Sequence, residues 1–321
     1  MFLAGVDEAG YGPLLGPLTV GFACFRVPSP GTDLWEVLRE TAARRPGRRD
    51  RRLRVDDSKR VNQGPRGRER MERTVLAFRE LLRPASPGWE RDLRAWVEEP
   101  PSGRSGERER APWLRDLDHP LGTTVSRERA RLDAAALDRH LRRGGAHLAA
   151  FGARAVPAVE WNRLLDRHGG KAGAHFAAVA EVLRHLLRET AGAPLRVEVD
   201  RHGARTRYRD LLERSLAPEA IEVHGEGPRG SAYTLHQGGR EIQIRFQEEA
   251  EDRHFPVALA SLAAKHTRER LMDLWNAWFG RRAPALRPTK GYTQDGRRWL
   301  QEAGGLLREL ELPAEVLVRR L

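Results

Sequence analysis

The sequence has very little of two features that define large classes of proteins. It contains a single cysteine, Cys24, so it can form neither an intrachain disulfide nor a zinc site built from cysteines. No apolar run reaches the roughly eighteen residues that a membrane-spanning helix needs. The apolar stretch Pro13–Phe25 contains two prolines and follows two acids rather than a basic segment, which is not typical of a signal peptide. We therefore expect a cytoplasmic protein that does not enter a membrane.

Lysine is also scarce. The chain has 57 Lys and Arg against 45 Asp and Glu, a formal net charge of +12. This balance favours a polyanionic partner such as a nucleic acid. Nearly all the cations are arginines, so an arginine run reflects a coding bias more often than a binding patch. The lysines kept against this bias indicate positions that need a compact ammonium group, and they are Lys59, Lys171, Lys265 and Lys290.

Hydrophobic periodicity predicts an α/β chain. Strand-like runs are expected at Phe2–Val6, Leu18–Phe25, Leu195–Val199 and Glu241–Phe246. Helices are expected near 67–83, 127–143, 176–187, 206–216 and 258–279. The segment Pro100–Gly106 is expected to be a flexible loop.

These patterns predict three parts of the chain. Residues 1–61 and 149–285 form the expected catalytic domain, residues 62–148 a helical insertion, and residues 286–321 a helical C-terminal extension. The helix near 67–83 has Met71, Val75 and Phe78 on one face, which predicts a surface arm with a small core of its own. The first turns of the helix near 258–279 consist of small residues that allow close approach to a sheet or a ligand.

Four acids stand where a predicted strand ends or a helix is about to begin. Asp7 and Glu8 follow the first strand, Asp200 ends a later one, and Glu251 precedes the helix near 258–279. Strand ends are where ligands gather in α/β sheets. Carboxylates brought together without basic partners repel one another unless a cation lies between them, and hard oxygen ligands suit Mg²⁺ or Mn²⁺. Two such ions about 3.5–4 Å apart can activate water and stabilise the leaving oxygen in phosphodiester cleavage.

The local sequence around these acids forms four short motifs. They are GVDEAGYGP at Gly5–Pro13, DDSK at Asp56–Lys59, ASLAAK at Ala260–Lys265 and KGYT at Lys290–Thr293. In content and order they resemble the motifs of the type 2 ribonucleases H, the ribonuclease HII and HIII family. The resemblance covers residues 1–61 and 155–295.

This resemblance implies an RNase H-like mixed sheet flanked by helices. It also implies a metal-dependent endoribonuclease that cuts the RNA strand of RNA–DNA hybrids at a site of four carboxylates and two Mg²⁺ or Mn²⁺ ions. Asp7, Glu8 and Asp200 match the first three acids of the family. The fourth position lies ten residues before Ser261, at Glu251, with Asp252 as the alternative. The implied partner is an RNA–DNA hybrid or ribonucleotide-containing DNA, bound by a monomer.

Two further elements of the family are implied to contact the nucleic acid sugar. The turn Gly10-Tyr11-Gly12 matches a turn that reads ribose 2′-hydroxyls through its backbone, the group that distinguishes RNA from DNA. The family usually has Arg or Lys where this chain has Tyr11. Tyr292 matches a tyrosine that stacks under a sugar at an RNA–DNA junction.

Two motifs offer candidate phosphate contacts. Ser58 and Lys59 belong to the DDSK motif, and Lys59 is suited to contact a phosphate or to neutralise charge in the transition state. Ser261 and Lys265 are four residues apart, so they share one face of the predicted helix.

Two alternative functions stay open. The first is a non-catalytic relative that binds hybrids or DNA, which the complete set of acids disfavours. The second is another RNase H-fold nuclease of the resolvase or transposase kind, which the DDSK and KGYT motifs disfavour. Within the family, the acids and Tyr11 favour HIII-like behaviour, whereas Tyr292 and a signature that starts at residue 5 favour HII-like behaviour.

Overall fold

A computed structural model describes residues 1–47, 49–82, 92–98 and 111–320 of the chain. The expected loop Pro100–Gly106 lies outside the described residues. The strands are β1 Phe2–Ala9, β2 Leu18–Arg26, β3 Ala42–Ala43, β4 Leu53–Arg54, β5 His147–Val156, β6 Leu195–Asp200, β7 Ala220–Gly227, β8 Gly230–Gln237 and β9 Arg240–Gln247. The four expected strands are therefore confirmed.

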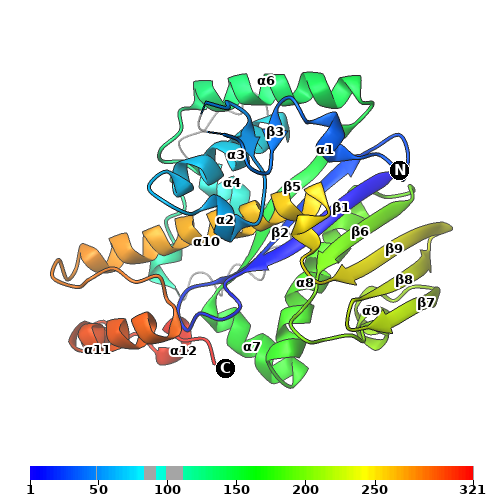
Figure 1. Ribbon diagram of the computed structural model, residues 1–321. Helices are drawn as coiled ribbons and strands as arrows, with labels where there is room; N and C mark the ends of the chain where they lie inside the picture. Colours follow the sequence, from blue (N-terminus) through cyan, green and yellow to red (C-terminus); the bar gives the residue numbers. More distant parts are fainter. Residues whose placement is uncertain (48, 83–91, 99–110, 321) are drawn as a thin grey trace.

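The helices fall on both sides of the main sheet (Figure 1). They are α1 Leu34–Val37, α2 Ser58–Val61, α3 Gly67–Leu82, α4 Asp92–Glu98, α6 Arg127–Arg143, α7 Ala158–His168, α8 Lys171–Glu189, α9 Arg209–Leu216, α10 Phe255–Gly280, α11 Thr293–Glu309 and α12 Ala314–Leu317, with short 3₁₀ turns η2 Pro112–Leu114 and η3 Ala250–Asp252. All five expected helices are present. Within the described ranges, no helix has both the length and the apolar composition needed to cross a membrane.

The main sheet of the described chain has seven strands in the order β5-β2-β1-β6-β9-β8-β7 (Figure 1). β1 pairs with β2 antiparallel and with β6 parallel, and β6 pairs with β9 parallel. The carboxyl ends of β1, β6 and β9 therefore meet at one edge of the sheet. The predicted mixed sheet flanked by helices is confirmed, but the β7–β8 hairpin was not predicted. Most residues of β7 are exposed, so this edge strand lacks the apolar alternation that indicates a strand.

α10 crosses one face of the sheet at close range. Ala260, Ala263 and Ala264 are fully buried. A Cβ atom added to Gly21 of β2 would lie 2.0 Å from the carbonyl oxygen of Ala260, so only glycine fits there. The small residues of this helix thus allow it to approach the sheet, as the sequence predicts. The opposite face of the sheet is covered by α7, α8 and α9 (Figure 1).

The helices of segment 62–148 share a core with the rest of the protein. Phe78 of α3 is fully buried. Its ring centroid lies 6.3 Å from that of Phe25 in β2 and 6.0 Å from that of Phe255 in α10. The same hydrophobic cluster includes residues of β5, α6 and α10. The prediction of a surface arm with its own small core is therefore wrong. Periodicity shows that a helix has an apolar face but not which element covers that face.

The shared core makes a testable prediction. Phe78→Ala should lower the free energy of unfolding by about 3–5 kcal/mol, because it leaves a cavity between α3, β2 and α10. Leu132→Ala on α6 is the matched control. Leu132 is 63% exposed, so its truncation should change stability by less than about 0.5 kcal/mol. Both are measured by chemical denaturation. A separate early transition for segment 62–148 in the Phe78→Ala protein would contradict the shared core.

Candidate active site

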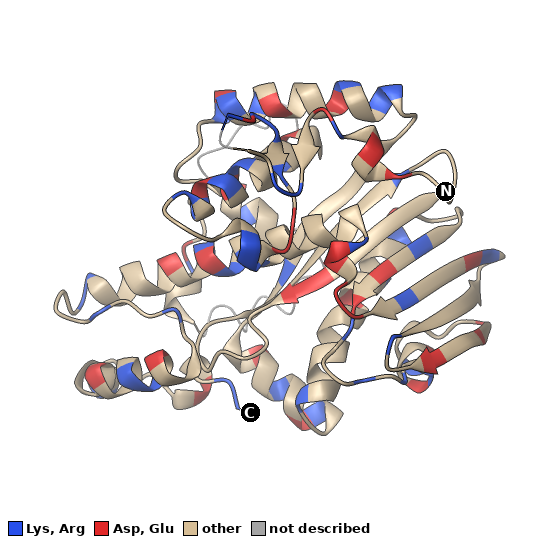
Figure 2. Cartoon of the chain, in the orientation of Figure 1, with Lys and Arg blue, Asp and Glu red and all other residues tan. Residues whose placement is uncertain are grey.

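Three of the four predicted acids reach one edge of the sheet through the parallel strands. β1 and β6 pair in a register that sets Val6 opposite Val199, which places Asp7 beside Asp200 at the two strand ends. Glu251 lies in η3, the turn that joins β9 to α10. Glu8 follows Asp7 in β1. Figure 2 shows acidic residues on the end of β1 and on the neighbouring turn that contains η3.

The electrostatic state of Asp7 shows that the acids lie close together. Asp7 is 9% exposed. Its pKa is raised well above the ordinary value, first by burial and then by the neighbouring charges of Glu8, Asp200 and Glu251, whereas a hydrogen bond from Ser261 lowers it. One oxygen of Asp7 also accepts a 2.7 Å hydrogen bond from the backbone N–H of Glu8. Asp7 is thus a buried carboxylate among like charges.

Asp200 and Glu251 also lie near other acids. Burial and the charge of Glu251 raise the pKa of Asp200 to about 7, although the backbone N–H of Ala250 donates a 3.2 Å hydrogen bond to Asp200 Oδ1. Burial also raises the pKa of Glu251, helped by Asp57 and Asp252, while Lys59 lowers it. Glu251 Oε2 is buried and has no hydrogen-bond partner in the described structure. This unpartnered oxygen fits a role as a metal ligand.

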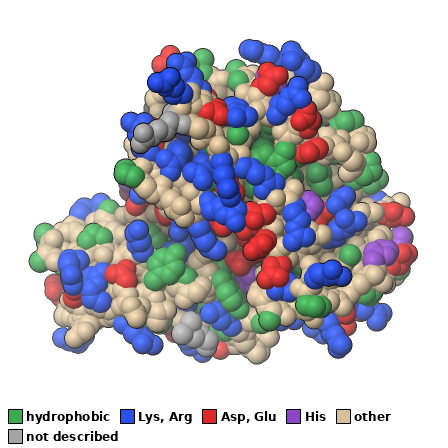
Figure 3. Space-filling model, viewed as in Figure 1, with side chains coloured by type: hydrophobic (Ala, Val, Ile, Leu, Met, Phe, Trp, Pro, Cys, Tyr) green, Lys and Arg blue, Asp and Glu red, His purple; other side chains and the backbone are tan. Residues whose placement is uncertain are grey.

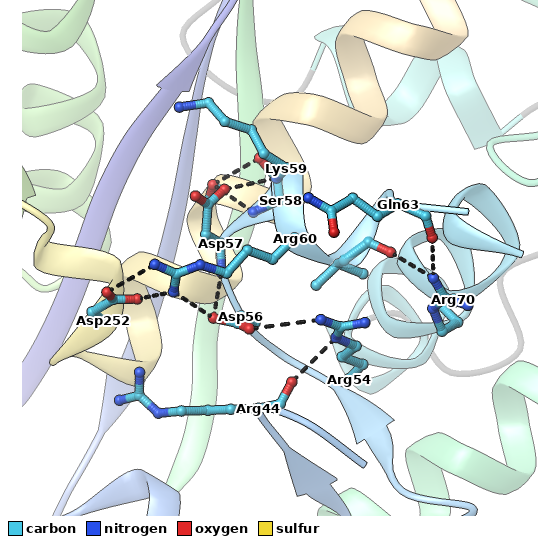
Figure 4. A network of polar contacts seen from close by, with 12 residues as sticks. Arg44, Arg54, Asp56, Asp57, Ser58, Lys59, Arg60, Gln63, Arg70 and Asp252 are labelled. Atoms are coloured by element: carbon cyan, nitrogen blue, oxygen red, sulfur yellow. Dashed lines mark hydrogen bonds and ion pairs between the residues drawn. The ribbon is translucent and has the colours of Figure 1, made fainter. Parts of the chain in front are cut away.

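Asp252, the alternative fourth acid, is engaged elsewhere. Its carboxylate forms an ion pair with Arg60, which also lies 3.3 Å from Asp56 (Figure 4). The hydrogen bond from Arg60 lowers the pKa of Asp252. The charge of Glu251 instead adds to the raised pKa values of Asp7 and Asp200. These contacts therefore favour Glu251 as the fourth acid of the cluster.

The four predicted acids are adjacent but not tightly clustered. Within the described ranges, no three of Asp7, Glu8, Asp200 and Glu251 bring one oxygen each within 4.8 Å of the other two. Neither Lys nor Arg pairs with Asp7, Asp200 or Glu251 within 4 Å in the described chain. Hard oxygen ligands without basic partners fit Mg²⁺ or Mn²⁺.

The DDSK and ASLAAK motifs meet beside Asp7. The hydroxyls of Ser58 and Ser261 are 3.0 Å apart, and the backbone N–H of Ser58 lies 3.4 Å from Ser261 Oγ. The side chain of Asp57 caps the short helix α2 by accepting a hydrogen bond from the backbone N–H of Lys59 (Figure 4). The side chain of Lys59 is exposed. The structure thus joins α2 to α10 through Ser58 and Ser261 and holds Lys59 near Glu251.

Arg268 links the segment that follows the Gly10-Tyr11-Gly12 turn to the KGYT segment. Its guanidinium donates hydrogen bonds to the carbonyls of Leu15 and Lys290, at 3.1 and 3.0 Å. Gly10 has φ +87°, and a Cβ there would lie 2.6 Å from Arg268 Nε, so both backbone and packing require glycine. A Cβ at Gly12 would meet nothing within 4 Å. Arg268 is buried and its role was not predicted from the sequence.

Tyr11 is partly buried in a cluster of rings. Its ring centroid lies 6.3 Å from that of Trp161 and 4.7 Å from that of His175. Lys171 Nζ lies 4.5 Å from the centre of the Tyr11 ring. A cation therefore stands beside the turn in which Tyr11 replaces the usual Arg or Lys. Lys171 is one of the four lysines in this arginine-rich chain. Its contact with Tyr11 could not be predicted, because the two residues are far apart in the sequence.

A hollow of about 590 Å³ lies between α10, the start of α3 and the KGYT segment. Lys265 and Arg268 of α10 line it together with Lys290 and Tyr292. Tyr292 is 49% exposed, and the Arg268 guanidinium lies 5.9 Å from the centre of its ring. Lys265 Nζ lies 3.5 Å from Glu269. Figure 3 shows acidic side chains near the centre of the same face of the molecule with Lys and Arg side chains around them.

Comparison with known proteins gives structural neighbours only. No family model and no curated protein matches the chain. It is similar to a structure of the PCNA:RNase HII complex from Archaeoglobus fulgidus, with 14% sequence identity and a TM-score of 0.42; the match covers 99% of this chain and 94% of that chain. The match to ribonuclease H2 from Pyrococcus horikoshii has 16% identity and a TM-score of 0.40 and covers 99% of this chain and 92% of that chain. The match to Bst-RNase HIII in complex with Mn²⁺ has 14% identity and a TM-score of 0.39 and covers 99% of this chain and 66% of that chain.

These neighbours are ribonucleases H of the family that the four sequence motifs resemble. The mixed sheet flanked by helices agrees with the predicted fold class. At these identities and TM-scores the matches establish neither substrate nor mechanism, which depend on the side chains of the chain itself.

The raised pKa of Asp200 gives a pH-dependent prediction. A carboxyl whose pKa rises from about 4 when unfolded to about 7 when folded stabilises the protein at low pH, and this stability is lost as pH rises through 7. In EDTA, Asp200→Asn should therefore raise Tm over the wild type by at least about 2 °C at pH 8, and by less at pH 5.

Asp252→Asn is the matched control. The pKa of Asp252 is lowered by Arg60, so its charge stabilises the fold above pH 4, and its removal should leave Tm unchanged or lower at pH 8. Equal effects of the two substitutions across this pH range would show that Asp200 is not held among like charges.

Proposed function

We propose that this protein is a metal-dependent endoribonuclease that cuts the RNA strand of RNA–DNA hybrids. The observation that carries the proposal is that buried Asp7 lies with the partly buried Asp200 and Glu251 at the edge where three parallel strands end. Burial and the charges of Asp200 and Glu251 raise the pKa of Asp7, and burial and the charge of Glu251 raise the pKa of Asp200. A buried group of like charges costs stability in the metal-free protein, and such a cost is retained where an active site needs it.

Asp7, Glu8, Asp200 and Glu251 are the residues that would hold two Mg²⁺ or Mn²⁺ ions. Ions bound there would supply an activated water and stabilisation of the leaving oxygen in phosphodiester hydrolysis. Ser261 orients Asp7 by a hydrogen bond, and the N–H of Ala250 orients Asp200. These contacts fix the direction of each carboxylate before substrate arrives.

The surroundings of the acids support a polyanionic substrate. Lys59 lies near Glu251, and Lys265 and Lys290 line the hollow between α10 and the KGYT segment. Ammonium groups at such positions would contact phosphates and supply affinity. Backbone groups of the turn would read the 2′-hydroxyls, and exposed Tyr292 would stack against a sugar. We propose that a monomer binds one duplex along this face.

Substitution of the two neighbouring acids tests the catalytic assignment. Glu251→Gln keeps the shape of the side chain but removes a ligand charge, so cleavage of a labelled RNA–DNA hybrid should fall by about three orders of magnitude, or ~4 kcal/mol of barrier. Asp252→Asn, the control, should retain cleavage within about threefold of the wild type. Hybrid binding should weaken far less than cleavage in both variants, since phosphate contacts supply most of the affinity.

The substrate class is tested with four labelled duplexes: an RNA–DNA hybrid, DNA with one ribonucleotide, plain DNA and double-stranded RNA. The proposal requires cleavage of the RNA strand of the hybrid and none of plain DNA. A folded protein that binds the hybrid without cutting it would instead support a non-catalytic relative. Preferential cleavage of plain DNA junctions would support a resolvase-like nuclease.

Tyr11 offers a further test of substrate preference. The turn has Tyr11 where the family usually has a cation, so we expect a continuous hybrid to be cut better than DNA with one ribonucleotide. Tyr11→Arg should shift the ratio of the two rates by about tenfold toward the single ribonucleotide, the effect of one charge-assisted hydrogen bond. Tyr292→Ala should reduce cleavage at the junction. A wild-type protein that prefers the single ribonucleotide would refute this account of Tyr11.

A further inference from the structure

Two histidines lie beside the acidic edge. Among the described residues, Glu8, His175 and His202 are a group whose potential ligand atoms all lie within 4.8 Å of one another. They come from β1, from α8 and from the turn after β6. His175 Nε2 lies 3.6 Å from Glu8 Oε2, and the two imidazole centroids are 4.3 Å apart. Three distant segments of the chain therefore present two nitrogens and one oxygen to a common point.

Three of the ring nitrogens there are buried without a hydrogen bond to any described residue. They are Nε2 of His175, a residue that is 1% exposed, and both ring nitrogens of His202. A buried polar group without a hydrogen bond destabilises a protein, so such groups in native proteins call for a ligand.

The rings are suited to bind a cation. A neutral imidazole ring offers the lone pair of one nitrogen to a metal ion. Pairing of Glu8 with a protonated His175 would satisfy only one ring and would leave both nitrogens of His202 without partners. A single cation satisfies one nitrogen of each ring and the Glu8 carboxylate together.

We propose that Glu8, His175 and His202 form a binding site for a divalent transition metal ion of the zinc type. Two histidines and one glutamate hold zinc in several hydrolases and leave a position open for water. Tetrahedral bonds of about 2.0–2.2 Å set the ligand atoms about 3.3–3.5 Å apart, close to the 3.6 Å between Glu8 and His175. Mg²⁺ prefers oxygen ligands, so imidazole selects against it.

This site does not depend on the proposed nuclease activity, because its two histidines are outside the set of acids Asp7, Asp200 and Glu251. Glu8 belongs to both groups. Occupation of the histidine site therefore places a second kind of ion next to the acids, with Glu8 as the shared ligand.

Isothermal titration of Zn²⁺ into the metal-free full-length protein in millimolar Mg²⁺ tests the site. We expect one zinc ion to bind despite the Mg²⁺. His175→Gln or His202→Gln should weaken its binding by more than about 100-fold, beyond the 10–100-fold typical of residues that only support a ligand. His185→Gln is the matched control, since His185 is on the same helix but packs against Phe22.

Glu251→Gln separates this proposal from the proposed nuclease. That variant should lose hybrid cleavage yet bind zinc within about threefold of the wild type. If the protein cuts no substrate but binds zinc through the histidines, the nuclease proposal fails and the metal site stands. Zinc affinity that is unaffected by both histidine substitutions, or zinc that millimolar Mg²⁺ displaces, would overturn the site.

X-ray absorption at the zinc edge of the wild-type protein is independent of how the variants fold. One equivalent of zinc should show the multiple-scattering pattern of two imidazoles. A shell of oxygen ligands alone would place the ion among the carboxylates and overturn the proposal.

Discussion

The repulsion between carboxylates at the end of β1 is the constraint on which the site depends. The parallel register of β1 and β6 sets Asp7 beside Asp200, and the turn after β9 adds Glu251. The fold holds these acids together because the strands are fixed by the packing of α10, which approaches the sheet at Gly21. The free energy that this arrangement costs in the absence of ions is small beside the burial of the shared core.

The same edge organises the groups around the acids. Ser58 and Ser261 join α2 to α10 next to Asp7, and Arg268 joins Leu15, which follows the glycine turn, to Lys290 in the segment that carries Tyr292. Each link connects elements that are far apart in the sequence. The groups proposed to contact the substrate are therefore positioned by the same packing that positions the acids.

Much of this arrangement could be predicted from the sequence. The strand patterns predicted that Asp7 and Asp200 stand at strand ends, and the small residues of α10 predicted its close approach to the sheet. The choice of these acids as a catalytic site came from the resemblance of their motifs to a known family, and it stays a prediction. Local pattern could not identify the β7–β8 hairpin, whose edge strand is mostly exposed, or the partner of α3. It also could not predict the contact of Lys171 with Tyr11 or that of His175 with His202, because these contacts depend on how α8 packs against the sheet. The spacing to Ser261 favoured Glu251 over Asp252, but the ion pair between Asp252 and Arg60 depends on the fold and could not be predicted from the sequence.

The dependence of hybrid cleavage on divalent ions tests the central claim most directly. The wild-type protein is incubated with a labelled RNA–DNA hybrid in EDTA, in Mg²⁺ and in Mn²⁺, and both strands are followed. Because buried carboxylates without basic partners need cations, we predict cleavage of the RNA strand with Mg²⁺ or Mn²⁺ and none in EDTA. Equal cleavage in EDTA, or no cleavage with either ion by a folded protein that binds the hybrid, would contradict the account.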